Sequence, residues 1–295
     1  MNEQDILIPE ELAIHSAKDE LLQIINNKKF KDKILCRIKS DFHNIKIVEN
    51  EIGRFLHYGN TYQAGFIDTP FYKGNLPYIN YFLIPYLINP KIENILLIGL
   101  GTGKIVNDFE FLFNKLKSID VVDIEENILS LAIDYFGFKP SKKFNFILQD
   151  GITYLNTSKK KYDLILADVA NNEGIDLRFL EDEYFKLIKK HLKKSGMFVS
   201  NMCSSADFSH PKNIFFKKYF PIYEQNFRNN LIFKGDYSDK IYYKSFFNLD
   251  ERVIDITNVI IISSDMYDNI PYEEKNIKKV EQLNIKIEKY IEDLS

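Results

Sequence analysis

The chain has 295 residues, of which 45% are hydrophobic and 27% are charged, and its formal net charge is −3 at pH 7. This composition is typical of a globular protein, and the small negative charge gives no general attraction to nucleic acid. No run of about 20 apolar residues is present, which argues against a membrane-spanning helix. The acidic start MNEQDILIPEEL lacks the pattern of a signal peptide, and the two cysteines form no metal-like pair. These features predict a cytoplasmic protein.

The first 90 residues are expected to form a unit of their own. Residues 9–29 carry leucine, isoleucine and alanine at helical spacing, which predicts a helix. Residues 34–68 alternate apolar and polar side chains between turn signals, which predicts short antiparallel strands. The stretch PYINYFLIPYLI at 77–88 is expected to be a buried helix.

From residue 91 to residue 295 the pattern changes to alternating strands and helices. Strands are expected at 94–99, 118–124, 144–150, 162–169, 196–202 and 258–264, and helices at 104–116, 125–136, 151–158, 180–192 and 272–293. Apolar strands that alternate with amphipathic helices indicate βαβ units with right-handed crossovers. The sequence therefore predicts an α/β class protein with a mostly parallel, doubly wound, Rossmann-like sheet.

Three glycines, Gly99, Gly101 and Gly103, lie where the first of these strands meets its helix. Glycine allows strained backbone angles and a close approach to a ligand, and the helix N-terminus favours negative groups. A phosphate-binding P-loop is excluded because Lys104 is followed by Ile105, and the dinucleotide pattern GxGxxG fits poorly. The spacing GxGTG is instead typical of S-adenosylmethionine-dependent methyltransferases and their relatives. A glycine turn without any ligand is the alternative.

Acidic residues follow the next three strands. Asp123 lies twenty residues after Gly103, where a carboxylate can accept both hydroxyls of an adenosine ribose, and Glu125 is close by. Asp150 ends the third strand, where it could meet an adenine amino group, and Asp168 ends the fourth. Each acid alone is more often a solvated helix cap. Their recurrence at successive strand ends favours a binding site.

The order of these motifs resembles the spermidine synthase family of aminopropyltransferases over roughly residues 45–265. The segment IVENEIGRFLHYGNTYQ resembles that family's N-terminal hairpin, and PYINYFLIPYL resembles its tyrosine-bearing helix. LQDGITYL resembles its Asp-Gly motif, and LILADVANNEGIDLRFLEDEYF resembles the loop that carries its catalytic acid. The resemblance implies a small β-rich N-terminal domain on a methyltransferase-like domain, usually in a homodimer.

The resemblance also implies roles for individual residues, with S-adenosylmethionine or its decarboxylated form as co-substrate, no metal, and an amine or other nucleophile as acceptor. Asp168 and Asn171 would face the reacting amine, and Tyr78 and Glu173 would contact the acceptor. The donor would be held by Gly99, Gly101, Thr102, Gly103, Asp123, Asp150, Gly151 and Gln63.

Four positions depart from the family pattern. Asn171 stands where the family usually has the second Asp of its Asp-x-x-Asp loop, which acts as the base. Asn cannot accept a proton, and loss of a general base typically costs about 10²–10⁴-fold in rate. Thr102 stands where an Asp is usual and would tolerate the carboxylate of intact S-adenosylmethionine, while Ile79 and Asn80 replace His-Glu. Aminopropyl transfer, methyl transfer and nucleoside binding without catalysis therefore all stay open.

The remaining aromatic and histidine residues are expected to have structural roles. The aromatic-rich stretch from Tyr58 to Tyr81 could wall an acceptor pocket, but core packing is the favoured interpretation. The histidines show no metal-ligand spacing. His191 lies among lysines in a predicted helix and is expected to be solvated.

Overall fold

A computed structural model describes residues 30–59, 61–68, 73–169, 176–205, 218–234 and 256–266. The helices predicted at 9–29 and 272–293 lie outside these residues. Among the helices that are described, none has the length and apolar character needed to cross a membrane.

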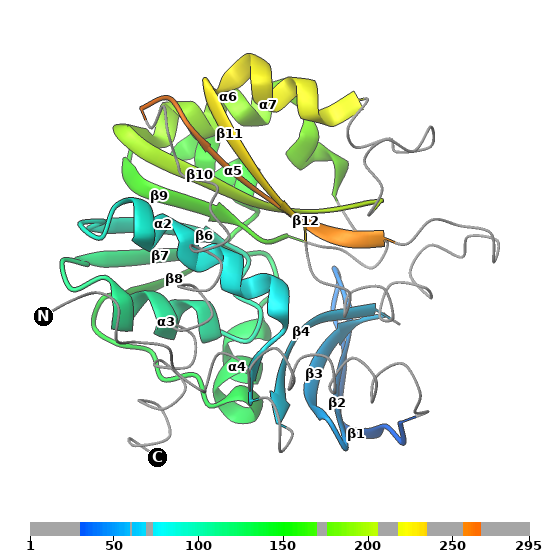
Figure 1. Cartoon of the computed structure of the whole chain (residues 1–295). Helices are drawn as coiled ribbons and strands as arrows, with labels where there is room; N and C mark the ends of the chain where they lie inside the picture. The colour runs from blue at the N-terminus through cyan, green and yellow to red at the C-terminus, as the bar shows by residue number, and fades with distance from the viewer. Residues whose placement is uncertain are drawn as a thin grey trace, which may run out of the picture.

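The N-terminal residues form an antiparallel sheet in which each strand pairs with the next one along the chain (Figure 1). Its strands are β1 (Lys33–Lys39), β2 (Asn44–Asn50), β3 (Gly53–Tyr58), β4 (Thr61–Asp68) and β5 (Lys73–Asn75). The short antiparallel strands predicted for 34–68 are therefore confirmed.

The second sheet has the strand order β11-β12-β10-β9-β6-β7-β8 over the described residues. Its strands are β6 (Asn94–Ile98), β7 (Ser118–Asp123), β8 (Phe144–Leu148), β9 (Tyr162–Ala167), β10 (Leu192–Ser205), β11 (Asn229–Lys234) and β12 (Ile256–Ser264). Strands β6 to β10 are parallel, whereas β12 pairs antiparallel with both β10 and β11. The chain order reverses direction between β6 and β9, which makes their carboxyl ends the expected place for a ligand. The predicted α/β, doubly wound fold is confirmed.

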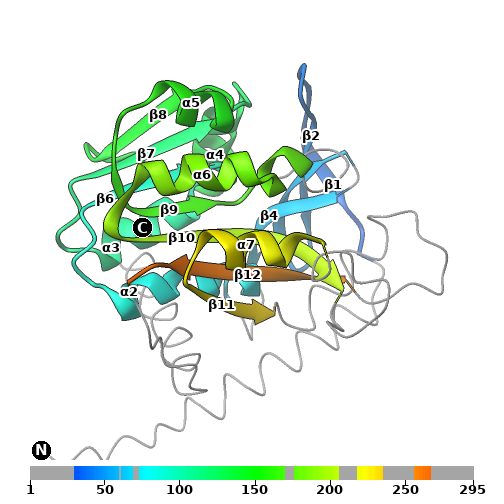
Figure 2. The same cartoon turned by 90° about the horizontal axis from the view of Figure 1, so that it is seen from above.

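Helices cover both faces of this sheet (Figure 2). They are η1 (Pro77–Leu83), α2 (Ile84–Ile88), α3 (Lys104–Leu112), α4 (Ile128–Phe136), α5 (Gly151–Thr157), η2 (Leu177–Leu180), α6 (Asp182–His191) and α7 (Phe220–Asn226). In β6, Ile95 and Leu97 pack with α3, α4 and the N-terminal sheet, while Leu96 and Ile98 pack with α5 and α6. Because side chains alternate along a strand, the continuous apolar runs in the sequence serve two cores.

Sequence patterns and structure differ in a few elements. The single helix expected at 77–88 is a 3-10 turn, η1, followed by the short α2, because Pro85 begins a new turn. Helix α7 and strand β11 were not predicted. Tyr78 and Tyr81 are buried in the core, which confirms the packing interpretation for these two aromatic residues.

The prediction that His191 is solvated is wrong. Its side chain is 1% exposed at the C-terminus of α6. Nδ1 lies 2.7 Å from the main-chain oxygen of Lys160, and Nε2 lies 2.7 Å from that of Leu155. The lysines around it mark the solvent face of the helix, but His191 itself lies on the face turned toward α5 and the start of β9.

Replacing His191 with Leu should therefore lower the free energy of unfolding by about 1–3 kcal/mol, because a carbonyl oxygen inside the protein loses the hydrogen bond that the imidazole donates. Chemical denaturation of the purified protein would measure this. The neighbouring Lys190 is exposed and serves as the control, since Lys190→Leu should leave the midpoint nearly unchanged. Equal effects of the two substitutions would contradict a structural role for His191.

Candidate functional site

A cavity opens at the carboxyl ends of β6, β7, β8 and β9, and the N-terminal sheet closes one side of it. It is lined by Phe42, His43, Leu56, Tyr58, Gln63, Ala64, Ile98, Gly99, Gly101, Val122, Asp123, Ile124, Asp150, Gly151, Asp168, Val169, Asp176, Arg178 and Phe179. The acids that the sequence places at successive strand ends are therefore brought together. The cavity coincides with the reversal of strand order between β6 and β9.

The glycine loop after β6 forms the floor of the cavity. Gly99 has φ +95°, and a Cβ placed on it would lie 2.3 Å from the main-chain oxygen of Asp168. Only glycine combines this backbone angle with such a close approach. Gly99 therefore sets how near the loop after β6 comes to the end of β9.

Two of the predicted loop residues do not line the cavity. Thr102 is buried, with 6% of its surface exposed, and is absent from the lining residues. Gly103 has φ +75° and faces Phe138, whose ring a Cβ would approach to 2.5 Å. Gly103 thus serves packing at the start of α3, whereas Gly99 and Gly101 border the cavity.

Asp123 at the end of β7 is held by the main chain on both carboxylate oxygens. Oδ2 accepts a hydrogen bond from the Leu100 N–H at 2.8 Å, and Oδ1 accepts one from the Glu125 N–H at 2.9 Å. Each oxygen keeps a lone pair, so the group can still accept two hydroxyls of a ligand. Burial raises the pKa of Asp123 against the effect of the two main-chain hydrogen bonds.

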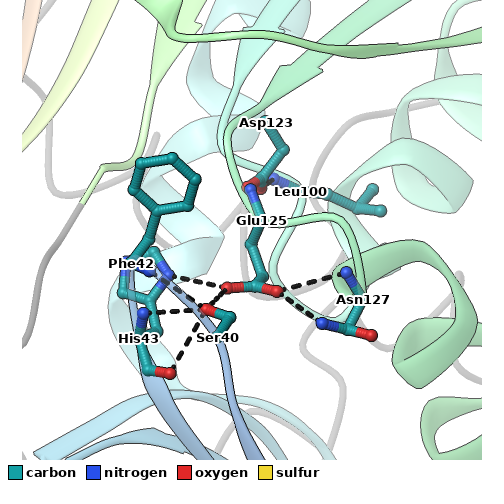
Figure 3. Close-up of polar contacts among 7 residues, drawn as sticks. All are labelled: Ser40, Phe42, His43, Leu100, Asp123, Glu125 and Asn127. Carbon is teal, nitrogen blue, oxygen red and sulfur yellow. Dashed lines mark hydrogen bonds and ion pairs between the residues drawn. The ribbon is translucent and has the colours of Figure 1, made fainter.

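Glu125 connects the second sheet to the N-terminal sheet (Figure 3). It is fully buried, and its Oε2 accepts from Ser40 Oγ at 2.5 Å and lies 3.2 Å from His43 Nδ1. Its Oε1 accepts from Asn127 Nδ2 at 2.9 Å. Burial alone would raise the pKa of Glu125, but hydrogen bonds from Ser40 and Asn127 outweigh it, so the pKa is lowered.

The turn between β1 and β2 also provides a wall of the cavity. The ring of His43 stacks on that of Tyr58 with centroids 4.0 Å apart and an angle of 18° between the planes. Phe42, next to it, is 50% exposed and lines the cavity. Glu125 therefore fixes an aromatic wall as well as linking the two sheets.

Asp150 caps a helix, as considered from the sequence, and also lines the cavity. In this cap of α5, Oδ1 accepts from the Thr153 N–H at 2.9 Å. Its Oδ2 lies 3.1 Å from Arg178 Nη2, and Arg178 also pairs with Asp176 at 2.6 Å. Burial raises the pKa of Asp150, but the Thr153 hydrogen bonds and the Arg178 charge lower it by more.

Asp168 follows β9 and has few donors. Its Oδ1 accepts from Asn201 Nδ2 at 2.8 Å, which is the one side-chain hydrogen bond to this carboxylate from a described residue. Desolvation raises the pKa of Asp168 to about 6, and the Asn201 hydrogen bond lowers it only in part. Asp168 is thus the acid of this cavity that is best suited to gain and lose a proton near neutral pH.

The other predicted residues are divided between the cavity and its surroundings. Gln63 and Gly151 line the cavity. Tyr78 is not among the lining residues; it is 2% exposed, and its hydroxyl donates to the main-chain oxygen of Gln63 at 3.1 Å. Asn171 and Glu173 lie outside the described residues, so their roles stay predictions.

Among the residues of the site that sequence reasoning missed are Phe42, His43, Arg178 and Asn201. His43 carries no motif of its own, and it reaches Glu125 because the turn between β1 and β2 contacts the loop after β7. Arg178 sits two residues after Asp176, a spacing that did not suggest contact with Asp150. Among the described residues, no group of three or more histidine, cysteine, aspartate or glutamate side chains could hold a metal ion.

The charge of the cavity indicates the ligands that it can accept. Four aspartates line it and face one guanidinium, which is already paired with two of them. Carboxylates that are partly removed from water are stabilised by partners of opposite charge, so the cavity favours a ligand with positive groups.

Comparison with known proteins shows what the chain resembles. The Spermine/spermidine synthase domain matches residues 82–230, which is half of the chain. The polyamine aminopropyltransferase of Methanocaldococcus jannaschii is 30% identical over 171 residues, which cover 56% of each chain. That of Buchnera aphidicola subsp. Acyrthosiphon pisum is 26% identical over 175 residues, 57% of this chain and 59% of the relative. The chain thus spans less than two thirds of the length of these relatives.

Solved structures share the fold. A spermidine synthase in complex with the transition state analogue AdoDATO has a TM-score of 0.64 at 16% identity and covers 86% of this chain and 84% of its own. The spermidine synthase from Thermotoga maritima has a TM-score of 0.61, also at 16% identity, over 85% and 79% of the two chains.

Glu125 offers a test of how the two sheets are joined. Glu125→Ala should lower the free energy of unfolding by about 2–4 kcal/mol, because partly buried donors from Ser40 and Asn127 lose their buried acceptor. Thermal and chemical denaturation would measure this. The adjacent Glu126 is exposed, so Glu126→Ala is the matched control and should change little. A Glu125→Ala protein as stable as the control would show that this contact does not hold the sheets together.

Proposed function

The chain belongs to the spermine/spermidine synthase family, and we propose that it is a transferase that moves an aminopropyl group from decarboxylated S-adenosylmethionine to an amine acceptor. The observation that carries this proposal is the set of four aspartates around one cavity at the strand ends. A donor with a sulfonium and an ammonium group, and an acceptor that is itself a cation, both match that charge.

Each end of the donor has a matching part of the cavity. Asp123 would accept the two ribose hydroxyls on the lone pairs that Leu100 and Glu125 leave free. Asp150 and Gly151 would border the adenine, and Gly99 and Gly101 would border the sulfonium. Gln63 lines the same cavity from the N-terminal sheet and would contact the donor there.

The charges favour the decarboxylated donor over intact S-adenosylmethionine. Thr102 was expected to tolerate a carboxylate, but Thr102 is not a lining residue, so that argument loses its support. Arg178 is the one arginine or lysine among the lining residues, and it is paired with Asp176 and Asp150. A carboxylate on the donor would therefore meet uncompensated negative charge.

Asp168 would act as the base. It would take a proton from the ammonium form of the acceptor, and the freed nitrogen lone pair would attack the carbon next to sulfur. The C–S bond would break with both electrons going to sulfur, which releases neutral methylthioadenosine and leaves the positive charge on a secondary ammonium product. Asn171 and Glu173 would contact the acceptor, but Asn171 cannot hold the proton, so this role falls to Asp168. Alignment of the three reacting atoms would supply much of the rate.

Calorimetric titration with the two donors, followed by product analysis with putrescine as acceptor, tests the proposal. Decarboxylated S-adenosylmethionine should bind at least tenfold more tightly than the intact form, because the intact form brings a carboxylate toward four aspartates. Turnover should release methylthioadenosine. Tighter binding of the intact donor together with release of S-adenosylhomocysteine would instead identify a methyltransferase. Binding of neither donor would overturn the proposal.

Asp168→Asn should separate activity from stability. Transfer should fall by about 10²–10⁴-fold, because Asn keeps the shape but cannot take a proton. In the parent protein the acid limb of kcat/KM should lie near pH 6, where Asp168 titrates. A substitution that leaves the rate within a few-fold would exclude Asp168 as the base.

The same substitution should stabilise the fold at neutral pH. Below about pH 4 the carboxyl group is protonated in both folded and unfolded states, so it contributes no difference. Above about pH 6 it is ionised in both, and the raised folded pKa means a penalty of about 2–3 kcal/mol, which Asn removes. Denaturation of both proteins at pH 4 and pH 8 would measure this, and an equal difference at both pH values would contradict it.

A further inference from the structure

A chain of two asparagine side chains leads from Asp168 to the neighbouring strands. Asn201 lies on β10 and donates from Nδ2 to Asp168 Oδ1 at 2.8 Å. Asn258 lies on β12 and donates from Nδ2 to Asn201 Oδ1 at 2.9 Å. We propose that Asn201 and Asn258 are positioning residues, which fix the orientation of the Asp168 carboxylate and keep a hydrogen-bond donor turned toward it.

The carboxylate of Asp168 determines the direction of the hydrogen bonds between these three side chains. An ionised carboxylate only accepts hydrogen bonds, so Asn201 must turn its NH₂ toward Asp168. Its carbonyl oxygen then points to β12, where it needs a donor, and Asn258 supplies one. Because Asn258 is 1% exposed, no solvent competes for that contact. Asn258 thereby selects one of the two orientations of the Asn201 amide.

The main chain of Asp168 is fixed independently of this pair. Its N–H donates to the Ile98 oxygen at 3.0 Å, and its own carbonyl oxygen packs against Gly99. Only the side-chain rotation of Asp168 is therefore left to be fixed by other contacts. Asn201 reaches it because Ser200 pairs with Ala167 in the parallel ladder of β10 and β9, which places the next residues of both strands side by side.

Other titratable and charged groups share the cavity and act on Asp168 in every variant alike. They are His43 and Tyr58 from the N-terminal sheet, Asp123 after β7, Asp150 after β8, and Asp176 and Arg178 at η2. Comparison of variants that differ only at 201 or 258 removes their common effect. The role of the pair in catalysis rests on the proposed function, whereas its effect on the Asp168 carboxylate does not.

The test is an NMR titration of protein labelled with ¹³C at the aspartate carboxyl carbons, with the Asp168 signal assigned from Asp168→Asn. Loss of a hydrogen bond to a charged group disfavours ionisation, so Asn201→Leu should move the Asp168 midpoint about one pH unit higher. Asn258→Leu should move it in the same direction by less, because the amide stays but is no longer held. An unchanged midpoint in Asn201→Leu would overturn the proposal.

Two further variants make the result specific. Asn226 is also a buried amide that donates to a carboxylate, Asp182, at 2.8 Å, but it lies outside the cavity, so Asn226→Leu should leave the Asp168 midpoint unchanged. If Asn258→Leu does not fold, the smaller Asn258→Ala replaces it. Its side chain cannot donate to Asn201 Oδ1, so the midpoint should move in the same direction as in Asn258→Leu. An Asn258→Ala protein with the parent midpoint would show that Asn258 does not orient the amide.

Rate measurements distinguish this proposal from the proposed function. If aminopropyl transfer occurs, the acid limb of kcat/KM should follow the NMR midpoint in Asn201→Leu. A protein with no transfer but a shifted midpoint would refute the function and keep the positioning pair. Transfer with an unshifted midpoint would refute the pair and keep the function.

Discussion

A carboxylate loses its hydration when it is buried. Four aspartates line the cavity at the ends of β6 to β9. Each must find hydrogen-bond donors inside the protein to stay ionised. Asp123 uses two main-chain N–H groups, and Asp150 uses the start of α5 together with Arg178. The loops after the strands are shaped by this demand, since their N–H groups turn toward the acids.

The N-terminal sheet takes part in meeting the same demand. Glu125 is fully buried, and two of its donors, Ser40 and His43, come from the turn between β1 and β2. That turn also brings Phe42 and His43 into the cavity wall. The Glu125 contacts therefore join this sheet to the larger one alongside their shared apolar core, and both parts contribute residues to the cavity.

The sequence predicted those residues of the site that lie at the carboxyl end of a strand. Alternating strands and helices, the glycine turn and the acids Asp123, Asp150 and Asp168 were all predicted, because parallel strands end at one edge of a sheet. His43 could not be found this way, since it reaches Glu125, 82 residues further along the chain, through contact between the two sheets. Asn201 was missed because it reaches Asp168 through the pairing of β10 with β9. His191 was misplaced because its lysine neighbours describe one face of a helix, and the residue faces the other. Thr102 was assigned by motif alone, and its burial beside the loop rather than in the cavity depends on the turn geometry.

The number of hydrogen-bond donors around each acid separates the acids that stay ionised from the acid that can transfer a proton. Glu125 and Asp150 receive several donors, which lower the pKa of each and keep them charged. Asp168 receives one from the described residues, and desolvation raises its pKa to about 6. A site made only of well-solvated acids would bind a cation but leave its amine protonated. Because Asp168 at the end of β9 has a single side-chain donor among the described residues, its carboxylate can take up a proton near neutral pH. The asparagines of β10 and β12 limit how much its pKa is raised.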